Sequence, residues 1–213
     1  SSDTTQVSAY RWNCGFAIDS ERFDDYNAWG VELVNEFDQV VDRITWGGQI
    51  ADQSIGRNSL GTWVLLQSPS PASVNATAAL LGSPTAVKIN EWSEADIVTT
   101  DGTFREFVEL YNPQTQAVNL SGLWLGDEPS ENGVRKWQFP NHSYVGASGH
   151  ALLLSSAGSN DPARISFAIQ RGGEMLFLSD QSQTWESLAF GMSSGLNSLG
   201  RTPDGSTSLG DLL

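Results

Sequence analysis

The chain has 213 residues, 39% of them hydrophobic and 10% aromatic, and a formal net charge of −14 at pH 7. The hydrophobic content suffices for a buried core and excludes a chain that is disordered throughout. Acidic residues outnumber basic ones by 25 to 11, which argues against nucleic acid and anionic membrane surfaces as partners, since both are bound by clustered cations. No run of apolar residues is long enough to predict a membrane-spanning helix, and a single cysteine excludes a disulfide within the chain.

The first part of the chain contains short apolar or alternating runs that predict antiparallel strands. These runs span residues 10–18, 31–34, 40–46 and 62–66. Residues 67–75 contain two prolines, which lack the backbone donor of a sheet ladder, so we expect an extended tail that ends the sheet. Residues 76–85 are predicted to be a linker with at most one helical turn.

A fuller set of predicted strands begins at residue 86. The strands cover residues 86–92, 104–111, 117–125, 135–139, 149–154, 165–169, 175–178, 185–190 and 198–201. Their density and the lack of a long segment with helical periodicity predict a β-sandwich over residues 86–213.

One sequence pattern occurs twice. Residues 42–57 align with residues 186–201 without a gap, at an offset of 144 residues. Both copies end in Ser-Ile/Leu-Gly-Arg, at Ser54–Arg57 and Ser198–Arg201. An internal repeat of this length predicts a tandem array of β domains. Because Arg57 and Arg201 occupy the same repeat position, we expect a recurring structural ion pair there rather than a ligand site.

Several segments after residue 86 carry a family likeness. They are Val87–Trp92 (VKINEW), Glu106–Pro113 (EFVELYNP), Val118–Asp127 (VNLSGLWLGD), Lys136–Pro140 (KWQFP) and Leu199–Gly205 (LGRTPDG). In this order they resemble the lamin tail domain in its bacterial, extracellular form. The resemblance implies an immunoglobulin-like β-sandwich over residues 86–213. It also covers residues 16–75, so that residues 1–75 resemble the C-terminal half of a preceding lamin tail domain.

The first copy lacks any counterpart of the strands at residues 87–92 and 106–113. Half a sandwich exposes an apolar face and open sheet edges, which soluble proteins avoid. Residues upstream of Ser1 could complete it, another chain could do so, or residues 1–66 could form a reduced sheet packed on the second domain. We favour the first two arrangements. Completion by another chain would be a head-to-tail contact, which builds an open fibre unless it closes into a ring.

Motifs of common enzymes do not occur: the sequence has no Gly-x-Ser-x-Gly, His-Glu-x-x-His, P-loop or Cys-x-x-Cys. The two histidines, His142 and His150, are predicted to be exposed loop residues. Glu106 and Glu109 lie three positions apart in a predicted strand, so they point to opposite faces and cannot act as an acid–base pair. We therefore predict that the chain is not an enzyme and binds no cofactor, calcium excepted.

Calcium is the one ion that the sequence suggests, because it takes six to eight oxygen ligands from flexible loops. Two oxygen-rich loops are candidates, one with Asp127, Glu128 and Glu131 and the other with Asp24 and Asp25. Neither has the spacing of an EF-hand, and both could equally be solvated acidic turns.

The leading interpretation is a non-catalytic structural or adhesive module, extracellular or at the cell surface, in a tandem array or a head-to-tail fibre. Its partners would be other copies of itself or adjoining domains, with no nucleic acid and no membrane insertion. The resemblance also implies an alternative, an accessory domain of a secreted hydrolase such as a nuclease or phosphatase. A further alternative is a carbohydrate-binding module, which would need Trp124, Trp137 or Trp185 to lie flat on the surface.

Overall fold

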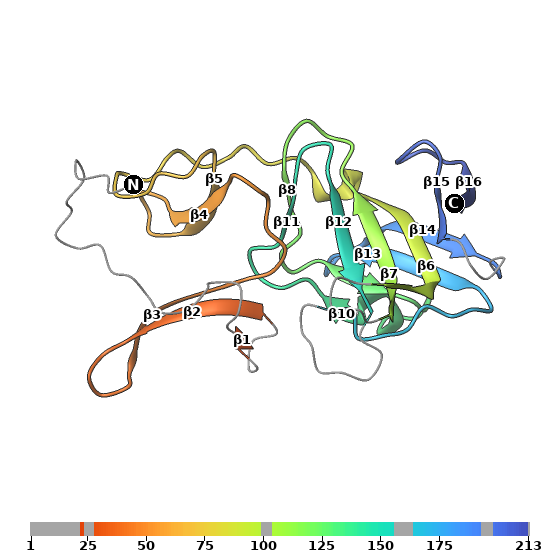
Figure 1. Cartoon of the computed structure of the whole chain (residues 1–213), viewed down its shortest axis with the longest axis horizontal. Helices are drawn as coiled ribbons and strands as arrows, with labels where there is room; N and C mark the ends of the chain where they lie inside the picture. Colours follow the sequence, from red (N-terminus) through yellow and green to blue (C-terminus); the bar gives the residue numbers. More distant parts are fainter. Residues whose placement is uncertain (1–21, 24–27, 99–103, 156–163, 193–197, 213) are drawn as a thin grey trace.

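The computed structural model describes residues 22–23, 28–98, 104–155, 164–192 and 198–212, and nearly all of its regular structure is β (Figure 1). The first part contains β1 (Arg22–Phe23), β2 (Ala28–Val34), β3 (Val40–Trp46), β4 (Ser54–Arg57) and β5 (Trp63–Leu66). Strands β1, β2 and β3 form one sheet, and β4 and β5 form another. The predicted strand at residues 10–18 lies outside the described residues.

The second part begins after the 3₁₀ turn η2 (Pro84–Ala86). Its strands are β6 (Lys88–Val98), β7 (Phe104–Tyr111), β8 (Val118–Asn119), β9 (Trp124–Gly126), β10 (Trp137–Gln138), β11 (Tyr144–Val145), β12 (His150–Leu154), β13 (Glu174–Ser179), β14 (Thr184–Phe190), β15 (Ser198–Arg201) and β16 (Leu209–Leu212). A second 3₁₀ turn, η3 (Gly133–Arg135), precedes β10.

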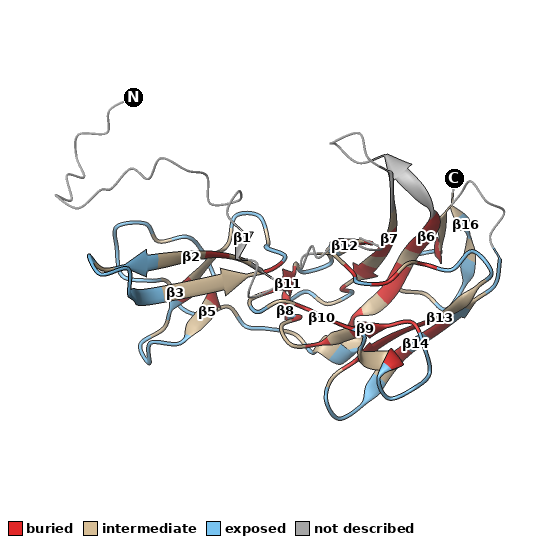
Figure 2. Ribbon diagram, turned by 90° about the horizontal axis from the view of Figure 1, so that it is seen from below, coloured by how far each residue is buried: buried red, intermediate tan, exposed pale blue. Residues whose placement is uncertain are grey.

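Two sheets of this second part pack face to face. One has the strand order β10-β9-β13-β14 and the other the order β12-β7-β6-β15-β16. Alternating apolar residues point inward from both sheets. The core they form contains Ile89, Val108 and Leu110 from one sheet and Leu125 and Leu176 from the other, all with no exposed surface. Figure 2 shows the buried residues gathered in this part of the chain. The predicted all-β sandwich is confirmed.

The hairpin of β2 and β3 has the same register as the hairpin of β13 and β14. Strands β3 and β14 have the same bounds at the offset of 144 residues that the sequence shows. Val31 lies opposite Ile44, and at the equivalent place Leu176 lies opposite Leu188. Each hairpin shifts register one pair before its loop. The repeated sequence therefore folds into a repeated local structure.

The next hairpin repeats as well. Strands β4 and β15 are again equivalent, with Arg57 opposite Trp63 in one hairpin and Arg201 opposite Leu209 in the other. We call β2–β3 with β4–β5 the first hairpin pair, and β13–β14 with β15–β16 the second hairpin pair. The two pairs differ in their surroundings: β15 also pairs with β6, whereas β4 and β5 form a two-stranded sheet among the described residues.

Residues 165–169 depart from the predicted strand. Ile165, Phe167 and Ile169 alternate inward and are buried, but among the described residues a single bridge, from Ile165 to Ser155, joins them to a neighbouring segment. Side chains take the place of a ladder here, because Glu106 accepts the Ile169 N–H and the Ser155 hydroxyl donates to the Phe167 carbonyl. The alternation of apolar residues at 165–169 therefore predicted their burial correctly, but the strand pairing that it also predicted was wrong.

The first part contacts the sandwich through the connection between β3 and β4. The Gly47 N–H donates to the Asn141 carbonyl at 3.0 Å, and the Tyr144 N–H donates to the Gly48 carbonyl at 2.8 Å. A small apolar cluster of Leu65, Ala117 and Tyr144 lies beside these bonds, with Ile50, Ile55 and Ala79 packed against it. Contacts of this kind are expected under the third arrangement considered for the first part, a reduced sheet packed on the second domain.

The predicted linker also bonds to both sides. Thr77 and Ala79 exchange backbone hydrogen bonds with Gln67 and Leu65, so this stretch runs along the outer edge of β5. Farther on, the Gly82 N–H donates to the Ala117 carbonyl of the sandwich. The connection between the two parts is therefore tied to each of them.

Replacing Gly47 with alanine is expected to open the contact between the two parts. A Cβ at Gly47 would lie 2.1 Å from Ser143 Oγ and 3.0 Å from Pro140 Cβ, whereas at Gly48 it would meet only the Tyr144 carbonyl at 3.8 Å. We expect G47A to speed hydrogen exchange of the Tyr144 amide by about tenfold or more, and G48A to leave it nearly unchanged. Equal exchange rates in the two variants would contradict this account of the contact.

Candidate functional site

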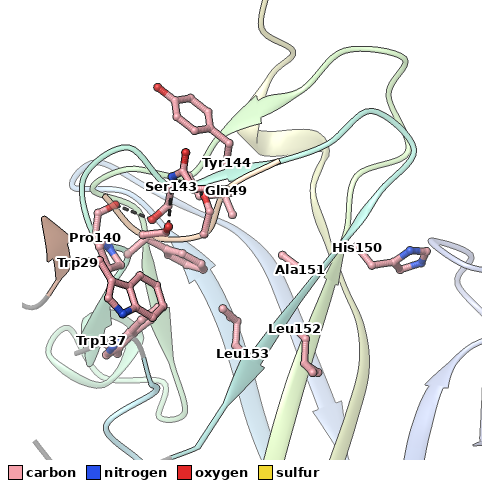
Figure 3. A pocket seen from close by; sticks show the side chains of 14 residues that line it. Trp29, Gln49, Trp137, Pro140, Ser143, Tyr144, His150, Ala151, Leu152 and Leu153 are labelled. Atoms are coloured by element: carbon pink, nitrogen blue, oxygen red, sulfur yellow. Dashed lines mark hydrogen bonds between the residues drawn. The ribbon is translucent and has the colours of Figure 1, made fainter. Parts of the chain in front are cut away.

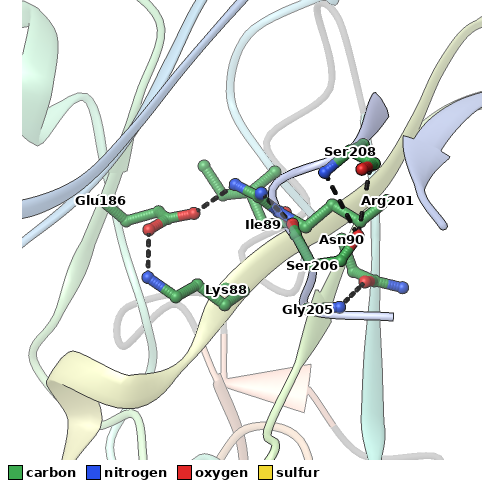
Figure 4. Close-up of polar contacts among 8 residues, drawn as sticks. All are labelled: Lys88, Ile89, Asn90, Glu186, Arg201, Gly205, Ser206 and Ser208. Carbon is green, nitrogen blue, oxygen red and sulfur yellow. Dashed lines mark hydrogen bonds and ion pairs between the residues drawn. The ribbon is translucent and has the colours of Figure 1, made fainter. Parts of the chain in front are cut away.

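A largely buried cluster of charged side chains surrounds Glu186 on β14 (Figure 4). Its two carboxylate oxygens accept from Lys88 Nζ and from Arg201 Nη2, each at 2.7 Å. Arg201 Nε donates at 2.7 Å to the Ile89 carbonyl of β6, and Nη1 donates to the Ser206 carbonyl. The cluster therefore joins β6, β14 and β15, which belong to both sheets, and its role is to hold them together.

The first hairpin pair repeats the centre of this cluster. Arg57 Nη2 lies 2.5 Å from Asp42 Oδ1, and Arg57 Nη1 donates to the Gly61 carbonyl at 2.8 Å. The expected recurring ion pair is confirmed. The sequence prediction did not name the acidic partners, although Asp42 and Glu186 lie at the same offset of 144 residues as the two arginines.

The two ion pairs differ in exposure. The side chains of Glu186 and Arg201 are 6% and 10% exposed, and those of Asp42 and Arg57 are 47% and 42% exposed. Strand β6 makes the difference, because it supplies both Lys88 and the Ile89 carbonyl to the buried pair. The ion pair of the second hairpin pair is thus covered by β6, whereas that of the first hairpin pair is exposed to solvent.

A cleft lies where the first part meets the sandwich (Figure 3). It has a volume of about 270 Å³ and is lined mainly by apolar and aromatic side chains, among them Trp29, Trp137 and Tyr144. The Ser143 hydroxyl at its wall already donates to the Pro140 carbonyl at 2.7 Å. Figure 3 shows His150 pointing away from the other labelled side chains. The cleft offers apolar packing and no arrangement of an acid, a base and a nucleophile.

The remaining candidate acids and histidines have structural partners. Glu106 and Glu109 point to opposite faces, as expected: Glu106 accepts the Ile169 N–H and Glu109 accepts from the Asn90 side chain. His142 is half-buried, and its Nδ1 lies 2.6 Å from the Thr45 carbonyl in the contact between the two parts. His150 is exposed and opens β12, with its Nε2 3.1 Å from Asp204.

The acidic loop after β9 is held by a protein cation. Lys136 Nζ donates to both carboxylate oxygens of Asp127, at 2.9 and 2.7 Å, and lies 3.7 Å from Glu128. Glu131 is exposed. In the described part of the chain, no three His, Cys, Asp or Glu side chains form a group that could hold a metal ion. The second candidate loop, with Asp24 and Asp25, lies outside the described residues.

Glu174, at the start of β13, is a half-buried carboxyl group with a strongly raised pKa. Burial raises its pKa from 4.5 to about 7, with further increases from Asp127 and Glu106. The hydrogen bond from the Gln170 N–H and the charge of Lys136 act in the opposite direction. The native state therefore holds a proton on Glu174 over a pH range in which the unfolded chain has released it.

Replacing Glu174 with glutamine is expected to remove a pH dependence of stability. Because the pKa of Glu174 is higher in the folded chain, its contribution to stability is present below about pH 4.5 and is lost as the pH rises through about 7. E174Q should therefore gain about 1 kcal/mol over the wild type between pH 5 and pH 8, measured by urea unfolding. Glu131→Gln, at an exposed position, controls for the lost charge. A difference independent of pH would contradict the assignment.

The three tryptophans that would serve a carbohydrate site do not stand free. Trp137 is buried against Phe139, with ring centroids 4.7 Å apart. Trp124 and Trp185 are partly buried, and their indole nitrogens are shielded from solvent. None of the three forms an open stacking platform, so this observation weighs against the carbohydrate-binding alternative.

Among the described residues, no helix has the length and apolar character needed to cross a membrane. The model of one protein family, described as Lamin Tail Domain, matches residues 82–207. No curated protein and no solved structure matches the chain. The matched segment contains both sheets of the sandwich up to β15 and the whole Glu186 cluster. Since this segment spans more than half of the 213 residues, the chain belongs to the lamin tail domain family.

Proposed function

We propose that the protein is a structural or adhesive module at the cell surface or outside the cell, working as one part of a tandem array of lamin tail units. The lamin tail domain is a non-catalytic immunoglobulin-like module, so the coarse assignment as a non-enzymatic β-sandwich follows from family membership. In the finer proposal, residues 1–75 are the C-terminal half of a second unit that precedes the sandwich.

The observation that carries the array is the agreement between the two hairpin pairs. Strands β3 and β14, and likewise β4 and β15, have the same bounds at the 144-residue offset. The two pairs also share the register, the position of the register shift and the arginine–carboxylate pair. Agreement at all four levels is expected of two copies of one unit and has no reason to arise between unrelated hairpins. In such an array the function is mechanical, because rigid sandwiches fix the spacing of surfaces along the chain.

The negative charge bears on the solubility and the partners of the module. A net charge of −14 keeps sandwiches apart and soluble, and it favours basic partners or cations over nucleic acid. The partners under this proposal are neighbouring lamin tail units, either in the same polypeptide or in other copies of it.

The proposal is tested on the native polypeptide from its source. Its denatured intact mass is expected to exceed the 23.0 kDa of this chain by at least the N-terminal half of a lamin tail unit. Protease added to intact cells should also cleave it. A native polypeptide that lacks this half would contradict a tandem array within one polypeptide and would leave completion by another copy. One that protease cannot reach would contradict the location. A catalytic domain in the same polypeptide would favour the accessory-domain alternative instead.

A further inference from the structure

Among the described residues, no strand pairs with the edge of β4 that faces away from β5, whereas the equivalent edge of β15 pairs with β6. In the sandwich, β15 lies between β16 and β6, with Leu199 opposite Trp92 and Gly200 opposite Glu91. Among the described residues β4 pairs with β5 alone. An open edge carries unpaired backbone donors and acceptors, and proteins bind extended peptides by adding a strand there.

The backbone groups of this edge can be identified from the hairpin. The Asn58 N–H bonds the Thr62 carbonyl, and bonded and non-bonded pairs alternate along antiparallel strands. Ile55 and Arg57 therefore direct their N–H and C=O groups away from β5. The Arg57 carbonyl indeed accepts from Asn75 Nδ2 at 2.8 Å, on the side away from β5.

The residues of β4 suit a close backbone neighbour. At Gly200, a Cβ would lie 3.0 Å from the Asn90 carbonyl of β6, so glycine lets β6 approach β15. Gly56 occupies the equivalent position in β4. A Cβ there would lie 3.0 Å from Asn75 Nδ2, so the Asn75 side chain stands where the backbone of β6 stands in the sandwich.

The open ion pair supplies charge for the same neighbour. Lys88 of β6 binds Glu186 at 2.7 Å, and Asp42, the equivalent carboxylate, is 47% exposed beside Arg57. A strand with lysine at the Lys88 position would meet Asp42, and its carbonyl at the Ile89 position would meet Arg57 Nε. The edge and the ion pair therefore point to the same sequence pattern.

We propose that the edge of β4 opposite β5 is an acceptor site for one extended strand with the sequence pattern of β6, given by the N-terminal half of another lamin tail unit. The strand lies antiparallel to β4, with its glutamate opposite Gly56 and its tryptophan opposite Ile55. It displaces the Asn75 side chain from the Arg57 carbonyl. The source of the strand rests on the proposed function, since the array supplies the N-terminal half.

The test uses the full chain and a synthetic peptide of residues 86–93, AVKINEWS. We expect saturable binding below about 1 mM, with the amides of Ile55 and Arg57 exchanging quickly in the free chain and protected by the peptide. In β6, Trp92 shares a bonded pair with Leu199, so its N–H faces the acceptor strand, and the N–H of Glu91 faces the other way.

Two N-methylated peptides give a matched control on an unchanged protein. Methylation of the tryptophan N–H should weaken binding by about tenfold or more, and methylation of the glutamate N–H should not. A second peptide carries alanine in place of its lysine and so cannot pair with Asp42. D42N should weaken binding of the original peptide more than binding of this alanine peptide. These results support the proposal.

Several results would overturn it. They are no saturable binding, equal binding of the two methylated peptides, or amides of Ile55 and Arg57 already protected in the free chain. A dimer that protects these amides and resists the peptide would also overturn it, because a second copy would then hold the edge. Failure of peptide binding leaves the array standing, whereas a native polypeptide that lacks the N-terminal half of the first unit removes the tandem array and leaves peptide binding intact.

Discussion

Replacing Glu186 with alanine is expected to destabilise the sandwich by about 3 kcal/mol or more. The carboxylate is 6% exposed and bonds both Lys88 and Arg201. Its removal leaves the Arg201 guanidinium, which is 10% exposed, without a counter-charge in a region of low polarity. Urea unfolding followed by tryptophan fluorescence measures the loss in the free energy of unfolding.

The first hairpin pair provides the matched control. Asp42→Ala removes the equivalent carboxylate from a pair whose side chains are 47% and 42% exposed. Solvent screens such a pair, and the freed Arg57 can be hydrated, so the expected cost is within about 1 kcal/mol. Similar losses in E186A and D42A would contradict the conclusion that β6 covers one pair and leaves the other open.

Replacing Trp92 with alanine is expected to cost about 3–5 kcal/mol. Trp92 lies in β6 and is 2% exposed. The centroid of its ring lies 4.9 Å from that of Phe190 on the opposite sheet. The alanine variant loses this contact between the sheets and leaves a cavity that rigid neighbouring strands cannot fill. Thermal and urea unfolding both measure the loss.

Two variants separate the cavity from other effects. Trp92→Phe keeps an aromatic ring against Phe190 and removes an indole N–H that has no hydrogen-bond partner among the described residues. We expect it to cost less than about 1.5 kcal/mol. Phe37→Ala removes an aromatic ring that is 73% exposed and should be nearly neutral. A W92F variant as unstable as W92A would show that the ring volume is not what stabilises this site.

Sequence reasoning predicted the architecture because alternation records burial directly. The strand at residues 104–111 was predicted with its bounds, and β3 and β14 follow from the repeat. The two-residue strand β11 and the edge strand β16 were missed. Short strands carry too few residues to show a period, and Leu209 of β16 is 46% exposed, which removes the alternation that marks a buried face.

Some predictions about functional residues could likewise be made from the sequence, and others required the tertiary structure. Arg57 and Arg201 were correctly predicted to form a recurring structural ion pair, although the carboxylates were not identified. The absence of enzyme motifs agrees with a non-catalytic family. Asp127 was read as a calcium candidate, and its bond to Lys136 depends on a turn that brings together residues nine positions apart. Sequence alone does not show which cation a carboxylate meets.

The fold class, the repeat and the family can be predicted from the amino-acid sequence, because these depend on local periodicity and on the order of segments along the chain. The three-dimensional packing shows which copy of the ion pair is covered and which strand edge has no paired strand. Exposure depends on neighbours far apart in sequence: Lys88 and Glu186 are 98 positions apart and meet at 2.7 Å. Among the described residues, the repeated four-residue strand is therefore interior at Ser198–Arg201 and lies at a sheet edge at Ser54–Arg57.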